Sequence, residues 1–129
     1  MRLKAPLIAL ALCAAALPAW AQEPAAFAEA KIAAGKAMFE SGCHRCHAPN
    51  AKDPSYGPAL TGIVGRQAGS FEGYEYSEAL GGAPFVWTPA ALKAWMEDNQ
   101  HFLPGTKMRH VGITDTAVQD FIIAYLRTL

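Results

Sequence analysis

Two cysteines and two histidines stand together in the run Cys43-His44-Arg45-Cys46-His47. Thiols three positions apart can reach the two vinyl groups along one edge of a porphyrin and form thioethers. The histidine directly after the second cysteine then lies near the ring centre, where its imidazole can ligate iron. A backbone carbonyl can hold the other ring nitrogen and so fix the orientation of the imidazole. The spacing therefore predicts one haem c bound covalently through Cys43 and Cys46, with His47 as an iron ligand.

Other uses of this cysteine pair lack what they need. A structural zinc site takes four ligands, usually as two distant pairs, and the sequence has no second cluster of cysteine and histidine. A thioredoxin-type pair needs a βαβ setting, which the sequence does not indicate. In an exported protein two cysteines ordinarily suggest a disulfide. The histidine that follows directly favours a cofactor instead.

A second axial ligand would decide whether such an iron carries electrons or binds substrates. The side chains that could supply it are Met38, Met96, Met108, His44, His101, His110 and Lys107. Met108 ends a non-helical run that starts at Leu103, and such a loop can cross the haem face opposite His47. The other two methionines fall on expected helices, where methionine is more often core filler. The attachment loop places the first of the histidines badly for ligation, and we expect the other two at the surface or rim.

Met108 is therefore the expected sixth ligand. A methionine and histidine pair raises the haem potential relative to two nitrogen ligands. It also occupies both axial positions, which leaves none open for oxygen or a substrate. This ligation favours electron transfer over catalysis.

Three longer helices and one short helix are expected to position these groups. The first runs from about Pro24 to Glu40, and a short one from Ser77 to Leu80 stops at a glycine pair. A hydroxyl followed by proline starts the third at Thr88-Pro89. The last opens at Thr114-Asp115 and carries an apolar face as far as Leu129. Residues 48–73 are rich in glycine and proline and lack periodicity, as expected of a loop that wraps a large rigid ligand. The fold class is therefore all-α.

The first 21 residues have the layout of a secretory signal peptide. Arg2 and Lys4 precede an apolar stretch that ends in Ala19-Trp20-Ala21, which predicts cleavage after residue 21 and a periplasmic location. The alternative is an uncleaved anchor, although the uncharged stretch has 17 residues, the lower limit for a membrane span. Residues 22–129 then form one domain with a net charge of −2. Without a basic run, nucleic acid is not an expected partner.

These motifs together resemble the class I cytochromes c, especially the mitochondrial type and its bacterial relatives, from about residue 31 to 127. The resemblance implies a small cytochrome c fold in which N- and C-terminal helices cross and loops wrap one covalent haem. It implies a crossing at Gly35, where the missing side chain lets two backbones approach and Tyr125 packs over the contact.

The resemblance also assigns site residues. It implies that the Pro58 carbonyl accepts a hydrogen bond from His47, and it identifies Pro104-Gly105-Thr106-Lys107-Met108 with the distal-ligand loop. The residues that it places around the haem propionates are Arg66, Tyr74, Tyr76 and Trp87. Such side chains supply donors for two carboxylates that are costly to bury unpaired.

The sequence departs from the family in four places. Trp95 stands where a tyrosine usually lies beside the methionine sulfur, and because an indole has one N–H and no acceptor, the hydrogen bonds near Met108 must differ. Leu80 replaces an internal asparagine. Gln100 and His101 replace basic residues, so attraction to acidic partners should be weaker than in mitochondrial members.

The expected function is that of a monomeric one-electron carrier between periplasmic or membrane redox proteins, with no small-molecule substrate and no enzymatic activity. One alternative is a haem subunit of a periplasmic oxidoreductase complex. A less favoured one is a haem peroxidase, which would need an open or easily vacated iron site. We further expect that His101 or Lys107 can displace Met108 as the pH rises.

Overall fold

Four helices make up the regular structure of the protein in the computed structural model, which describes residues 23–50 and 52–129. They are α1 (Ala25–Gly42), α2 (Glu78–Gly81), α3 (Pro89–Phe102) and α4 (Thr116–Leu126). This part of the chain holds no β-strand, which confirms the all-α class. Nor does any helix in it have the length and apolar character to span a membrane. The predicted signal peptide and its cleavage site lie outside the described residues.

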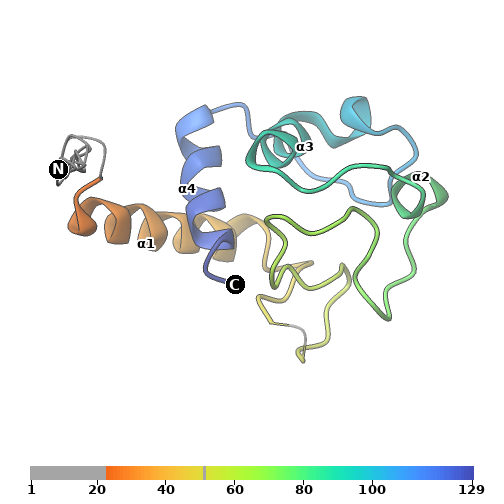
Figure 1. Cartoon of the computed structure of the whole chain (residues 1–129), viewed down its shortest axis with the longest axis horizontal. Helices are drawn as coiled ribbons and strands as arrows, with labels where there is room; N and C mark the ends of the chain where they lie inside the picture. Colours follow the sequence, from red (N-terminus) through yellow and green to blue (C-terminus); the bar gives the residue numbers. More distant parts are fainter. Residues whose placement is uncertain (1–22, 51) are drawn as a thin grey trace, which may run out of the picture.

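The first and last helices cross, as Figure 1 shows for α1 in orange and α4 in blue. Gly35 marks the crossing, because a Cβ built there would lie 1.8 Å from the Phe121 carbonyl oxygen and 3.1 Å from the Tyr125 Cβ. One turn further on, the Phe39 ring is 1% exposed and its centroid lies 5.3 Å from that of Tyr125. The expected crossing is therefore confirmed, and its closest contact is with the backbone of α4.

Side-chain caps set the starts of the three later helices. Ser77 accepts from the Leu80 N–H at 3.3 Å, Thr88 from the Ala91 N–H at 3.1 Å, and Asp115 from the Ala117 N–H at 2.8 Å. These are the caps that short polar side chains supply at helix N-termini. The boundaries differ slightly from those expected, since α1 continues to Gly42 and α4 ends at Leu126.

The long segment between α1 and α2 is irregular and forms the yellow-to-green region of Figure 1. Four of its glycines have positive φ, a backbone region that other residues adopt with difficulty: Gly62, Gly65, Gly69 and Gly73. The segment pairs briefly with the chain before α3 through an isolated antiparallel bridge between Gln67 and Val86. The Trp87 N–H donates to the Arg66 carbonyl at 2.9 Å, so this pairing brings two predicted site residues together.

A core of aliphatic and aromatic side chains joins α1, α3 and α4 to this segment. On the side of α3, four aromatic rings follow one another in edge contacts, with centroids 4.9 to 6.2 Å apart. They are Phe85, Trp87, Trp95 and Phe102. Such edge-to-face pairs are a favoured geometry for aromatic rings. This aromatic cluster places Trp95 beside the loop that follows α3.

Candidate functional site

The turn that follows α1 presents the two thiols and the imidazole of the attachment motif. The N–H groups of Cys46 and His47 both donate to the Cys43 carbonyl, at 3.0 and 2.9 Å. Both cysteines are free thiols, with Cys43 half-buried and Cys46 exposed. Burial, and to a lesser extent the neighbouring Cys46, raises the pKa of the Cys43 thiol. The two sulfurs are thus held on one tight turn and are free to form thioethers.

His47 is oriented by the segment that lies against it. Its Nδ1 lies 2.9 Å from the Pro58 carbonyl oxygen, so Nδ1–H donates and Nε2 keeps its lone pair. Burial lowers the pKa of this histidine, while the bond to Pro58 acts in the opposite sense. The ring packs so closely on Gly57 that a Cβ there would lie 2.6 Å from the His47 Cε1. A neutral, fixed imidazole with a free Nε2 is the donor that haem iron requires.

Met108 meets Trp95 at the predicted distal loop. The indole Nε1–H donates to the Met108 Sδ at 3.1 Å, and the Trp95 side chain is 7% exposed. The Trp87 ring packs edge to face against this indole, with ring centroids 5.0 Å apart. The departure noted in the sequence thus produces a hydrogen bond of its own, in which tryptophan is the donor to sulfur.

The other side chains that could ligate iron lie in the core, at the surface or in contacts of their own. Met96 is 8% exposed within the core, and Met38 packs against that core. His44 is exposed and stacks over Phe39, with ring centroids 6.3 Å apart, and His101 is exposed at the end of α3. The Lys107 ammonium donates to the Glu75 carbonyl at 2.5 Å.

His110, expected at the surface or rim, is only partly exposed. It is half-buried, with its Nε2 3.0 Å from the Met96 carbonyl oxygen and its Nδ1 buried without a hydrogen-bond partner among the described residues. The physical reason is that the chain after Met108 returns along α3. Gly112 lies so close to this helix that a Cβ there would be 2.2 Å from the Glu97 carbonyl oxygen.

The residues predicted to face the propionates lie on the irregular segment and its pairing with the chain before α3. Arg66 donates to the carbonyls of Thr61 at 2.8 Å and Ala59 at 3.1 Å, which uses two of its five N–H donors. Burial lowers the pKa of this guanidinium, and Tyr76 opposes the shift. The rings of Tyr74 and Tyr76 meet edge to face at 4.8 Å.

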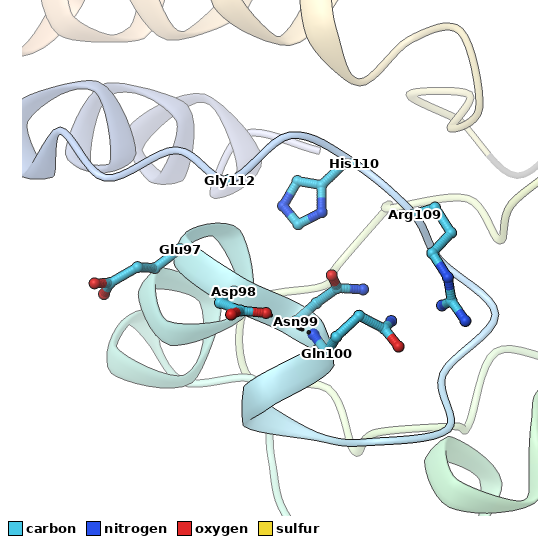
Figure 2. Close-up of a pocket in the computed structure, with 7 residues that line it drawn as sticks. All are labelled: Glu97, Asp98, Asn99, Gln100, Arg109, His110 and Gly112. Atoms are coloured by element: carbon cyan, nitrogen blue, oxygen red, sulfur yellow. Dashed lines mark hydrogen bonds between the residues drawn. The ribbon is translucent and has the colours of Figure 1, made fainter.

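Sequence reasoning missed the contacts of the Asn99 and Gln100 amides at the end of α3. Figure 2 shows Asn99 and Gln100 reaching from α3 toward the chain that carries Arg109 and His110. A cavity of about 270 Å³ lies between them, lined by Glu97, Asp98, Asn99, Gln100, Arg109, His110 and Gly112. Amides at the end of an amphipathic helix look like solvent-facing residues in a sequence. A break in the helix at Asp98, which has φ −156° and ψ 91°, redirects them.

The attachment turn presents the groups that bind one haem c. No three side chains of histidine, cysteine, aspartate or glutamate gather as a metal site among residues 23–50 and 52–129. Two free thiols that can form thioethers and an oriented imidazole that can ligate iron are the attachment groups of a c-type haem.

Comparison with known proteins gives the same family. The Cytochrome c family model matches residues 32–129. The chain is 41% identical to cytochrome c of Euglena viridis over 95 residues, which cover 74% of this chain and 93% of the relative. It is 43% identical over 95 residues to cytochrome c2 of Rhodopila globiformis, covering 74% of this chain and 90% of that protein.

A solved structure agrees with these relatives. Cytochrome cH from Methylobacterium extorquens superimposes with a TM-score of 0.70 at 42% identity, covering 76% of this chain and 98% of that one. The chain therefore belongs to the cytochrome c family and is a monohaem electron carrier that binds haem c through Cys43 and Cys46.

Proposed function

We propose that this cytochrome c is a periplasmic one-electron carrier whose haem iron is ligated by His47 and Met108. The observation that carries the ligation is the hydrogen bond from the Trp95 indole to the Met108 sulfur, at 3.1 Å. A buried donor aimed at a thioether fixes where that sulfur lies. The carbonyl of Pro58 supports the proximal side by holding His47 with Nε2 free.

When bound, the haem supplies the redox couple, and the protein supplies its ligands and its enclosure. His47 and Met108 would fill both axial positions and leave none for a substrate, which favours outer-sphere electron transfer over peroxidase chemistry. Arg66, Tyr74, Tyr76 and Trp87 would donate to the propionates, as buried carboxylates require. The remaining N–H donors of Arg66 support that assignment.

The sulfur-to-iron charge-transfer band of the oxidised protein tests the ligation. We expect the band at neutral pH in the native protein and its loss in Met108→Ala. Met96→Leu, which removes a core methionine of similar volume, is the matched control and should keep the band. If the native oxidised protein lacks the band, the proposed ligation is wrong and an enzymatic role becomes open again.

The partners are proposed to be redox proteins that do not depend on a strongly basic docking face. The residues before the distal loop are Gln100 and His101, and residues 22–129 carry a net charge of −2. Electron transfer to a membrane oxidase should therefore slow less with added salt than for a lysine-rich relative. Gel filtration of a native periplasmic extract separates a free monomer from a complex subunit, and fractionation of cells tests the location.

A further inference from the structure

Helix α3 breaks at Asp98 and restarts immediately. The Asp98 Oδ1 accepts from the N–H groups of Gln100 at 3.1 Å and His101 at 3.0 Å, as an N-cap side chain does at the start of a helix. Asp98 therefore sets the direction of the short last turn of α3. The two residues that follow it carry amide side chains, and the break turns both of them toward the distal loop, defined here as residues 103–108.

The two amides share the same pair of acceptors. Asn99 Nδ2 lies 3.2 Å from the Thr106 Oγ1 and 2.9 Å from the Met108 carbonyl oxygen. Gln100 Nε2 lies 3.1 and 3.0 Å from the same two oxygens. Asn99 is 3% exposed and Thr106 is 2% exposed, so the bond between them is shielded from water, and the other three are partly buried. Loss of both amides would leave buried acceptors on the loop with fewer donors, which is costly.

Arg109 also donates to this loop but cannot replace the amides. Its Nη1 bonds to the carbonyls of Thr106 and Met108, which are its own near neighbours in the chain. Such a bond shapes the loop without attaching it to α3. The amides of Asn99 and Gln100 come from the helix and join it to the backbone of Met108. Trp95 joins α3 to the sulfur, a weaker acceptor than a carbonyl.

We propose that Asn99 and Gln100 are positioning residues that keep Met108 on the iron by fastening the distal loop to α3. This inference rests on the proposed axial role of Met108. A competing ligand can enter only when Met108 leaves, and the loop cannot carry Met108 away without breaking the amide bonds. The apparent affinity for such a ligand is its intrinsic affinity reduced by the small fraction of molecules with the loop open. Removing the amides should raise that fraction.

Imidazole titration of the oxidised, haem-loaded protein measures the open fraction. The variants are Asn99→Leu and Gln100→Met, which are similar in size and have no donor, and the double variant. Each hydrogen bond is worth a factor of about two to twelve in such an equilibrium. Because either amide alone can serve both acceptors, we expect single variants to bind imidazole only about two to three times more tightly. The double variant should bind about tenfold more tightly or better, above the product of the single effects.

Gln67→Met is the matched control, because it also removes an amide bond to a backbone carbonyl, that of Ala83 at 2.9 Å, away from the distal loop. It should leave the imidazole affinity unchanged, even if it lowers the stability to urea. A purely structural role for Asn99 and Gln100 would lower urea stability without changing imidazole affinity. All variants should retain the sulfur-to-iron band before imidazole is added.

The experiment distinguishes failure of the proposed axial role of Met108 from failure of the proposed role of Asn99 and Gln100. A native protein without the sulfur-to-iron band would remove the proposed axial role of Met108, whatever the variants do. A native protein with the band, combined with a double variant whose imidazole affinity stays within about twofold of native, would overturn the fastening role alone. Should the double variant not fold, the single variants decide, and an unchanged affinity in both has the same meaning.

Discussion

Gly35→Ala should weaken the crossing on which the whole fold depends. The new Cβ would lie 1.8 Å from the Phe121 carbonyl oxygen and 2.5 Å from its carbon. Both atoms belong to the backbone of α4 and cannot rotate away as a side chain does. Since ordinary contact starts at 3.4 Å, the two helices must separate by about 1.6 Å. Close-packed interiors do not absorb a displacement of that size without loss of contacts.

The expected loss of free energy of unfolding follows from these distances. Overpacking a core costs about 1 to 3 kcal/mol, occasionally more, and this clash is at the severe end because both partners are backbone. The separation also loosens Phe39, which is 1% exposed, from Tyr125. The higher helix propensity of alanine offsets about 1 kcal/mol of this destabilisation. We therefore expect the free energy of unfolding to fall by about 2 kcal/mol or more.

Urea unfolding of the oxidised, haem-loaded protein, followed by tryptophan fluorescence, measures this loss. Gly42→Ala is the matched control, since it lies on the same helix and a Cβ there has no neighbour within 4 Å. The control should be as stable as the native protein or gain up to about 1 kcal/mol. If Gly35→Ala proves as stable as Gly42→Ala, α1 and α4 do not approach as closely as described and the reasoning fails.

Three further predictions concern the site. Trp95→Phe keeps an aromatic ring but removes the hydrogen bond to the sulfur of Met108, the proposed iron ligand. Without that bond the sulfur would donate more electron density to ferric iron, so redox titration should show a potential about 20 to 60 mV lower. An unchanged potential would contradict the effect of this bond on the proposed ligand. Gly57→Ala places a Cβ 2.6 Å from the His47 Cε1, so the expressed protein should contain less haem, measured as haem absorbance per molecule of protein. A native haem content would show that the His47 ring can move aside. Burial raises the pKa of Tyr76 despite the opposing effect of Arg66, so the contribution of Tyr76 to stability is complete below about pH 10 and is lost as the pH rises above it. In urea unfolding of the reduced protein, the free energy of unfolding should therefore fall less steeply with alkaline pH in Tyr76→Phe than in the native protein. An equally steep fall in both would refute this.

Much of the architecture could be predicted because it is encoded locally. The start of α3 follows from a hydroxyl and a proline in adjacent positions, Thr88 and Pro89, whose conformations suit a helix N-terminus in almost any context. Gly35 could be recognised as a crossing point through the family resemblance. The helix ends could not be predicted in the same way, because the continuation of α1 to Gly42 depends on the turn that carries Cys43.

The site, too, is encoded partly in the local sequence and partly in the tertiary structure. Cys43, Cys46 and His47 lie within five residues, so their spacing alone determined the covalent chemistry and the cofactor class. The tertiary structure decided how Met108 and its loop are held against α3. The bond from Trp95 to Met108 spans 13 positions, and the amides of Asn99 and Gln100 reach the loop because α3 breaks at Asp98. Tryptophan, asparagine and glutamine each accept many surroundings, so their partners are determined by the path of the backbone, which brings distant segments within hydrogen-bond reach.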